Sequence, residues 1–209
     1  MVVMLRKENN SQICILNGKV VFFATGNINK FNEARIILKH YGISVGMLRM
    51  KGDEIQSDNL REIAQTSSVN AFKLSKLPII VEDAGLFVDA LSGFPGPYAA
   101  YVYRTIHNKG ILKLMKNIAN RKANFKSTIA YLDESLKEPE CFDGESKGEI
   151  TLTERKKQGR SAFGFDPIFK PDENSKSFAE MTLEEKNDFS HRALAIRKFA
   201  EWYKTKLLK

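Results

Sequence analysis

The sequence predicts a mixed α/β fold, and three observations support that prediction. Lys19–Thr25 has the apolar run of a buried strand and leads directly into the helical pattern of Asn29–Tyr41. Ala123–Leu132 and Glu149–Thr153 alternate with the two-residue period of strands. His191–Lys206 repeats its apolar residues on one helical face. A strand, a turn and a helix at the start, followed by hairpin strands, indicate α/β architecture with a mixed sheet.

The remaining elements follow in order. Gly42 is placed to end the first helix as its C′ residue. Next come a strand, a helix, a short buried strand and its continuation, at Ile43–Arg49, Asp58–Lys76, Pro78–Val81 and Leu86–Leu91. We then expect a turn-rich loop at Ser92–Tyr98, a helix at Lys109–Asn117, a hairpin turn around Asp143–Gly148, and a capping box at Thr182–Glu185.

Length and composition fit one compact domain. The chain has 209 residues, 43% of them hydrophobic, which is enough for a sizeable core. It contains no run of the roughly 18 apolar residues that a membrane helix needs. The N-terminal stretch lacks the pattern of a signal peptide, so we expect a cytoplasmic protein with no membrane association.

The net charge of +8 favours anionic partners, namely nucleic acid, a membrane surface or a phosphate-bearing small molecule. Charge alone does not choose among them. The two cysteines, Cys14 and Cys141, lie far apart without a metal-ligand spacing, which indicates neither a disulfide framework nor a zinc site.

The turn after the first strand is the first candidate site. Thr25, Gly26, Asn27 and Asn29 offer a tight turn with exposed backbone N–H groups, which suits an anion at a helix N-terminus. Lys30 lies in the first helical turn, where the helix dipole disfavours a cation. A phosphate bound there would compensate the lysine; otherwise Lys30 is a solvated surface residue.

Carboxylates form the second candidate site. Glu82 and Asp83 follow an apolar run, and we expect them at the end of a strand, where open α/β sheets bind ligands. Glu54 would add a third carboxylate if the fold brought it close. Mg²⁺ prefers such hard oxygen ligands together with substrate phosphates, so the pattern suggests metal-assisted chemistry on a nucleotide. Solvated acids at a strand end remain the alternative.

Two further stretches carry aromatic and polar side chains. In "AFGFDPIF", Phe163 and Phe165 could stack on a base and Asp166 could accept a hydrogen bond from a ring N–H, although core packing explains the phenylalanines equally well. In "EEKNDFSHRALA", Lys186, His191 and Arg192 place three donors near a helix start. They could hold a carbonyl oxygen or a phosphate, or form an ordinary polar surface.

In this order the motifs resemble the inosine triphosphate pyrophosphatase family. The matching pieces are "TGNINK" with Glu33 three residues later, "EIQ", "VEDAGLFVDALSGFPGPY", "FGFDPIF" and "FAEMTLEEKNDFSHRALA". The resemblance covers Lys19 to Trp202 and implies an elongated mixed sheet with flanking helices, two lobes with a central cleft, and a homodimer. It also implies Mg²⁺-dependent hydrolysis of ITP, dITP and XTP to the monophosphate and pyrophosphate.

The resemblance also implies roles for individual residues. Glu54 and Asp83 would bind the metal, and Asp83 would accept the proton of the attacking water. Arg192 would help to distinguish a carbonyl at C6 from an amine. The residues expected to bind the substrate are Thr25, Gly26, Asn27, Ile28, Asn29, Lys30, Ala84, Phe163, Gly164, Phe165, Asp166, Lys186, His191 and Arg192.

The sequence departs from the family pattern at Ala84, where a hydroxyl residue is usual, and at Ala162, where glycine is common. Residues 1–18 precede the usual start and form an N-terminal extension, for which we expect disorder or weak packing, and residues 19–209 form the single domain. Two rival interpretations remain: a pyrophosphatase for other modified nucleotides, and a basic nucleic-acid-binding module. The nucleotidase interpretation predicts no stable nucleic-acid complex.

Overall fold

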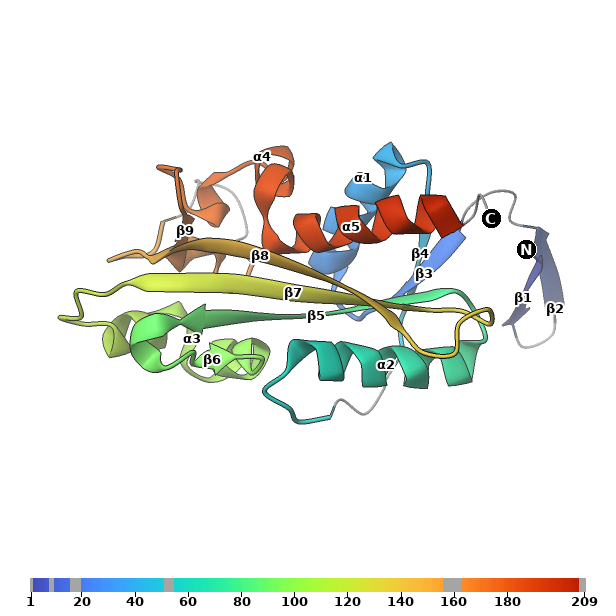
Figure 1. Ribbon diagram of the computed structural model, residues 1–209, viewed down its shortest axis with the longest axis horizontal. Coiled ribbons are helices and arrows are strands. Elements are labelled where there is room, and N and C mark those ends of the chain that lie inside the picture. The colour runs from blue at the N-terminus through green and yellow to red at the C-terminus, as the bar shows by residue number, and fades with distance from the viewer. Residues whose placement is uncertain (1, 8–9, 16–19, 51–54, 156–162, 207–209) are drawn as a thin grey trace.

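A computed structural model describes residues 2–7, 10–15, 20–50, 55–155 and 163–206 (Figure 1). The strands are β1 (Val2–Lys7), β2 (Asn10–Ile15), β3 (Val20–Ala24), β4 (Ser44–Leu48), β5 (Ile79–Val88), β6 (Pro95–Gly96), β7 (Lys122–Leu132), β8 (Glu140–Ile150) and β9 (Phe169–Pro171). The α-helices are α1 (Ile28–His40), α2 (Leu60–Ser75), α3 (Ala99–Leu114), α4 (Leu183–Phe189) and α5 (His191–Lys206). Three 3₁₀ turns are η1 (Asp89–Leu91), η2 (Asp166–Ile168) and η3 (Phe178–Glu180).

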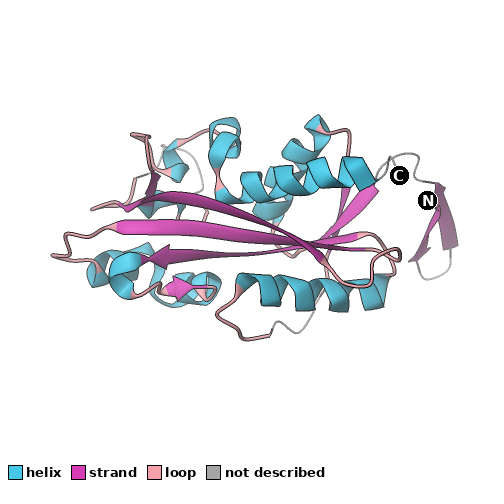
Figure 2. Ribbon diagram, viewed as in Figure 1, coloured by secondary structure: helices cyan, strands magenta, loops and turns pink. Residues whose placement is uncertain are grey.

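Seven strands form one long mixed sheet in the order β4-β3-β5-β7-β8-β9, with β6 paired to β5. β4, β3 and β5 are parallel, and the pairs β5–β7, β7–β8 and β8–β9 are antiparallel. Helices α1, α4 and α5 cover one face, and α2 and α3 lie on the other (Figure 2). The mixed, elongated α/β sheet with flanking helices is confirmed.

The core is divided between the two ends of the sheet. One cluster packs α1 and α5 against β3 and β7, with Phe23, Leu38 and Phe199 fully buried. The second packs α3, η2 and η3 against the far halves of β5 and β7, with Leu86 and Phe169 fully buried. These two clusters correspond to the two predicted lobes. Polar side chains lie on the part of the sheet between them.

The predicted helix starts and stops are largely confirmed. α5 spans the predicted residues, and Thr182 and Glu185 form the expected reciprocal capping box at α4. Gly42 follows α1 with φ +69°, the left-handed conformation that favours glycine. Asn27 caps α1 through its side chain.

The strand boundaries around Glu82 were predicted wrongly. β5 does not end at Glu82 and Asp83 but continues to Val88, so both carboxylates lie in mid-strand. Ion pairs to the Glu82 carboxylate compensate its charge inside the sheet and allow the strand to continue.

The predicted hairpin turn at Asp143–Gly148 is also wrong, because these residues lie inside β8. Gly144 permits close packing of α5 on the strand: a Cβ there would lie 2.0 Å from the His191 carbonyl oxygen. At Gly148 it would lie 2.3 Å from the Lys170 carbonyl oxygen. The glycines that suggested a turn instead serve close backbone approach.

Helix α3 begins ten residues earlier than predicted, at Ala99 instead of Lys109, and bends at His107, whose φ is 53°. Near the N-terminus, β1 and β2 pair antiparallel as a separate two-stranded sheet, with Val2 opposite Ile15. None of the helices in the described ranges is long and apolar enough to cross a membrane.

Candidate functional site

The turn between β3 and α1 is held by its own side chains. The Thr25 Oγ1 accepts a hydrogen bond from the Asn27 backbone N–H at 3.1 Å. The Asn27 Oδ1 accepts from the backbone N–H groups of Asn29 and Lys30 at 3.0 and 3.3 Å. Asn27 therefore caps two of the amides that the predicted anion site would offer.

Lys30 has a buried anionic partner. Its Nζ lies 3.1 Å from the Glu82 Oε2 and donates to the Glu82 backbone carbonyl at 3.3 Å. A cation in the first turn of a helix is unfavourable by itself, and the Glu82 carboxylate provides the compensation. The contact also joins α1 to β5, so the turn and the carboxylates belong to one site.

A cavity of about 570 Å³ opens beside this contact. Its lining includes Thr25, Gly26, Asn27 and Lys30 from the turn, Glu82 and Asp83 from β5, and Ser67 and Asn70 from α2. We call it the phosphate-side cavity. It brings together most of the turn residues and both carboxylates that the sequence singled out, whereas Ile28 is half-exposed at the helix start. Glu54 lies outside the described residues.

The structure distinguishes the two neighbouring carboxylates. Glu82 is buried, and its Oε1 accepts hydrogen bonds from the Ser127 hydroxyl at 2.8 Å and the Arg192 Nε at 2.9 Å. Burial alone would raise the pKa of Glu82, but the charges of Arg192 and Lys30 outweigh it and hold that pKa well below its usual range. Asp83 is half-buried and faces the other side of the sheet from Glu82. Glu82 therefore anchors the site, and Asp83 is the better candidate for chemistry.

A second group of charges is buried behind the turn. Glu33 from α1 pairs with Lys186 at 3.0 Å and with the Nη1 of Arg192. Lys186 also pairs with Asp166 at 2.7 Å. Burial would raise the pKa of Glu33, but the charges of Arg192 and Lys186 lower it to about 2. Five residues from five elements thus form the ionic network Glu33–Glu82–Asp166–Lys186–Arg192.

Next to the network lies a smaller cavity of about 190 Å³, which we call the base-side cavity. Its lining includes Asn29, Glu33, Phe163, Asp166 and Lys186. The Phe163 ring centroid lies 5.9 Å from the Lys186 Nζ and 5.9 Å from the Arg192 Cζ. Glu33 links this cavity through Arg192 to Glu82, which lines the phosphate-side cavity.

Phe165 does not have the base-stacking position considered for it. Its side chain is buried in the core, edge-on to Tyr103 with ring centroids 5.5 Å apart. Gly164 has φ +52°, and this turn directs Phe163 and Phe165 to different places. Phe163 is therefore the ring that can stack on a ligand, and Phe165 is a core residue.

His191 is also inside the protein. Its ring stacks on Phe125 with centroids 4.6 Å apart and planes 9° apart. Burial, with the nearby Arg192 charge, lowers the pKa of His191 well below its usual value. The imidazole is therefore neutral and packs against aromatic side chains of the core, Phe125 and Phe178. Ala84, on β5, is half-buried and places no hydroxyl there, and Ala162 lies outside the described residues.

Two residues of the site, Glu33 in the network and Ser127 bonded to Glu82, were not assigned a role from the sequence. Glu33 was noted only as part of a motif, although a carboxylate beside Ala34, Ile37 and Leu38 on the buried face of α1 calls for a partner. Ser127 lies in a strand and gives no local signal. Its role depends on strand pairing, which places it next to β5.

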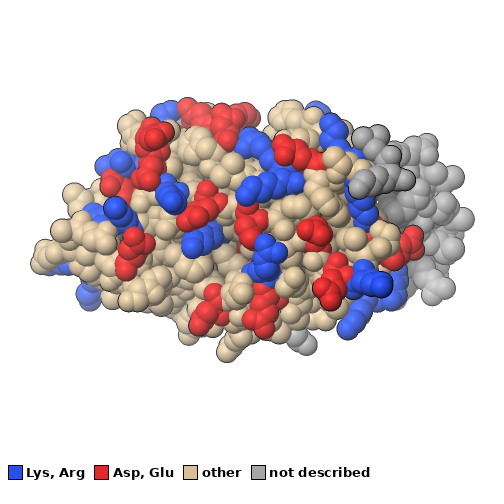
Figure 3. Space-filling model, viewed as in Figure 1, with Lys and Arg blue, Asp and Glu red and all other residues tan. Residues whose placement is uncertain are grey.

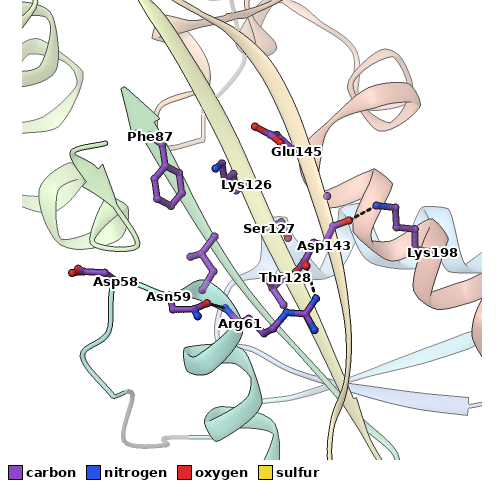
Figure 4. A pocket seen from close by; sticks show the side chains of 12 residues that line it. Asp58, Asn59, Arg61, Phe87, Lys126, Ser127, Thr128, Asp143, Glu145 and Lys198 are labelled. Carbon is purple, nitrogen blue, oxygen red and sulfur yellow. Dashed lines mark hydrogen bonds and ion pairs between the residues drawn. The ribbon is translucent and has the colours of Figure 1, made fainter. Parts of the chain in front are cut away.

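A third cavity of about 530 Å³ lies by the N-terminus of α2 (Figure 4). Its charged side chains largely satisfy one another. Arg61 pairs with Asp143 at 2.5 Å, Thr128 donates to the same carboxylate at 2.7 Å, and Lys198 donates to the Asp143 carbonyl at 2.7 Å. Among the described residues, none of the predicted site residues lines it.

The fold and the two ionically linked cavities define an α/β protein that can hold an anion beside a carboxylate in one cavity and a polar, planar group in the other. A sequence profile of the Ham1 family matches residues 21–202, and the chain belongs to this family.

Relatives and solved structures agree with this assignment. The chain is 48% identical to the dITP/XTP pyrophosphatase of Methanopyrus kandleri, over 88% of this chain and 96% of the relative. It is 46% identical to the dITP/XTP pyrophosphatase of Thermococcus kodakarensis, over 88% of this chain and 97% of the relative. The Ham1 protein structure from Coxiella burnetii superposes with a TM-score of 0.78 at 25% identity, covering 90% of this chain and 99% of that one.

Proposed function

We propose that this protein hydrolyses ITP, dITP and XTP to the nucleoside monophosphate and pyrophosphate, and so removes deaminated purines from the nucleotide pool. Relatives named dITP/XTP pyrophosphatase match almost the whole chain. The observation that carries the proposal is the pairing of Lys30 with Glu82 at 3.1 Å, which joins the β3–α1 turn to the strand that bears Asp83. This pairing makes one site from segments more than fifty residues apart.

The triphosphate fits the phosphate-side cavity. The turn from Thr25 to Lys30 lies at the N-terminus of α1, where backbone N–H groups and the helix dipole favour an anion. The Asn27 side chain holds two of these amides in the structure, so a phosphate oxygen would replace the Asn27 oxygen on them. Lys30 supplies a cation at 3.1 Å from Glu82, within reach of the cavity that both residues line.

The donor set also fits Mg²⁺. Asp83 offers a hard carboxylate oxygen in the phosphate-side cavity, and Mg²⁺ binds through one or two carboxylates together with substrate phosphates. Asp83 and Glu54 would hold the ion. When bound, Mg²⁺ would offset the charge that develops on the phosphates and the pyrophosphate leaving group.

A protein side chain would accept the proton in this reaction. Asp83 lies in the phosphate-side cavity, and its carboxylate would accept the proton of the water that attacks the α-phosphorus. Glu82 cannot easily take this role, because Ser127, Arg192 and Lys30 already surround its carboxylate. Lys30 would stabilise the negative charge on the transferring phosphoryl group.

The base fits the base-side cavity, with Phe163 stacking on the ring. The resemblance gave the reading of the C6 carbonyl to Arg192, but its Nε and Nη1 bond Glu82 and Glu33. We assign this role to Lys186, which donates hydrogen bonds from two of its N–H groups to Glu33 and Asp166 and keeps the third for a ligand oxygen such as the C6 carbonyl. Adenine presents an amine there and would leave the buried donor unpaired, which can reject an analogue by as much as ~10⁴-fold. Asp166 would accept the ring N–H.

A nucleotide panel tests the proposal. We expect pyrophosphate release from ITP, dITP and XTP in the presence of Mg²⁺, with kcat/KM for ATP lower by about 10²-fold or more. Equal turnover of ATP, or turnover of modified pyrimidine triphosphates in place of ITP, would assign a different substrate class. A gel shift against RNA and DNA addresses the nucleic-acid alternative, for which the proposal expects only weak, salt-sensitive binding.

The proposal includes a homodimer in the cytoplasm. Phe94, Tyr98, Tyr101 and Ile106 are exposed by 39–61% along β6 and the first half of α3, and such a row favours a protein contact. Light scattering at low protein concentration tests the dimer: a mass near twice 23.7 kDa supports it, and 23.7 kDa contradicts it. Cell fractionation tests the compartment.

A further inference from the structure

One segment of the chain carries positive charge without any acid. From Ala90 to Leu132 there is no Asp or Glu, whereas the segment contains Arg104, Lys109, Lys113, Lys116, Arg121, Lys122 and Lys126. The chain as a whole has 25 acids for 33 basic residues, and Figure 3 shows them interspersed on the face that carries α5 and β8. The proposed reaction uses none of these seven cations.

Four of the seven, Arg121 and three lysines, line a hollow at the end of α3. Lys109, Lys113 and Lys116 are exposed and line a cavity of about 630 Å³. Their spacing of four and three residues places them along one side of the helix and the turn that follows. Within the described part of the chain no carboxylate pairs with any of these three ammonium groups.

The interior of the hollow is apolar. Leu112, Met115, Ile118 and Leu152 line it, and Leu152 is 78% exposed. Leu114, which lies between the lining residues Lys113 and Met115 in the sequence, is 47% exposed. The helix dipole accounts for a lysine in the last turn of α3, but it does not account for large exposed leucines among the lysines. An apolar hollow with a cationic rim is the composition of a binding groove.

The groove is fixed by Arg121. This guanidinium donates to the backbone carbonyls of Met115 at 3.0 Å, Ile150 at 2.5 Å and Thr151 at 2.7 Å. These bonds tie the turn after α3 to the end of β8, the two walls of the hollow. A groove held in this way is formed before any partner binds, which lowers the entropic cost of binding.

We propose that this groove binds an acidic peptide segment of a partner protein, with an apolar side chain of the segment in the hollow and its carboxylates on Lys109, Lys113 and Lys116. The charge of the rim selects an acidic partner. Nucleic acid fits less well, because the described lining residues include no aromatic ring for stacking and their one arginine is occupied by carbonyls. A membrane is less suited to a concave surface than to a protruding apolar face.

The test uses the full-length protein and a fluorescent amphipathic peptide of Glu and Leu, measured by fluorescence anisotropy. We expect binding that weakens with salt, and a loss of affinity of about tenfold or more in the double variant Lys113→Glu/Lys116→Glu. The matched control is Lys39→Glu/Lys137→Glu, which also reverses one lysine in a last helical turn and one in a loop, both exposed. We expect this control to bind the peptide as the wild type does.

A second variant separates the groove from general charge attraction. Leu152→Ser leaves the charge unchanged and exposes no core, and we expect it to weaken peptide binding by about threefold to tenfold. Three outcomes overturn the proposal. The first is no binding of the peptide to the wild type, and the second is an equal loss of peptide affinity in the groove and control variants. The third is that the three lysines bind an RNA oligonucleotide or anionic vesicles and do not bind the peptide. Hydrolysis of ITP by both groove variants should remain at the wild-type level.

Discussion

The two cavities of the site are built in opposite ways. The phosphate-side cavity is lined by a solvent-accessible turn and a half-buried carboxylate, and its anion-binding groups are backbone amides, a helix end and one lysine. The base-side cavity rests on buried charges that already satisfy one another, because Glu33, Asp166, Lys186 and Arg192 are all less than 8% exposed. Under the proposed function, affinity for phosphate would come from open, adaptable groups, whereas recognition of the base would come from donors fixed in advance.

Replacing the proposed proton acceptor should have the largest effect. Asp83→Asn keeps the size of the side chain but removes its basicity, so turnover of ITP should fall by about 10³- to 10⁴-fold. Pyrophosphate release under saturating substrate measures the loss. Asp58→Asn is the matched control, because Asp58 is exposed and does not line the phosphate-side cavity, and it should leave turnover unchanged. Activity of Asp83→Asn within tenfold of the wild type would remove Asp83 from the mechanism.

Breaking the ionic network should lower the stability of the folded protein. Arg192→Ala leaves the buried carboxylates of Glu33 and Glu82 without their shared cation, so the free energy of unfolding should fall by about 3–5 kcal/mol. Urea denaturation measures this loss, with Arg197→Ala as the control, since the Arg197 guanidinium donates, among the described residues, only to backbone carbonyls. A loss below about 1 kcal/mol for Arg192→Ala would show that the network is not a structural unit.

The pH dependence of stability reports on Glu33. Its pKa is about 2 in the folded protein against an ordinary 4.5, so its contribution is complete above pH 4.5 and is lost as the pH falls toward 2. Between pH 5 and pH 3 the wild type should lose about 2 kcal/mol through this group. Unfolding of Glu33→Gln at the two pH values provides the comparison. If the variant loses as much stability between the two pH values as the wild type does, Glu33 does not have a lowered pKa in the folded protein.

The smallest effect should come from the aromatic ring on the base-side cavity. Phe163→Ala removes a stacking surface without opening the core, so binding of ITP should weaken by about 1–3 kcal/mol, which appears as a higher KM. Stability should not change. Phe165→Ala is the contrasting variant, because removing a buried ring should lower the free energy of unfolding by about 3–5 kcal/mol. Equal effects of the two variants on KM and stability would contradict the different positions of the rings.

Local sequence rules predicted the parts of the fold that local interactions determine. The Asn27 cap, the Gly42 stop and the span of α5 each depend on residues within one or two turns. The wrong boundaries arose where distant segments override such rules. β5 continues past Glu82 because Arg192 neutralises that carboxylate from 110 residues away. Gly144 marks the approach of α5 to β8 and not a turn.

The candidate site divides in the same way. Lys30, Asp83, Lys186 and Arg192 could be singled out by residue type and motif. That Lys186 and Arg192 bind Glu33 could not be predicted from spacing, because the partners lie 153 and 159 residues apart. Pairing of this kind depends on how α1, α4 and α5 pack together. Phe163 and Phe165 are two residues apart with similar local sequence, and only the turn at Gly164 separates a ligand-facing ring from a core ring.

The most direct test of the account is a crystal structure of the Asp83→Asn variant with ITP and Mg²⁺. We predict that the triphosphate lies in the phosphate-side cavity against Thr25–Lys30, and that hypoxanthine lies under Phe163 with Lys186 on its carbonyl. A nucleotide bound elsewhere, such as in the cavity beside Arg61 and Asp143, would contradict the account.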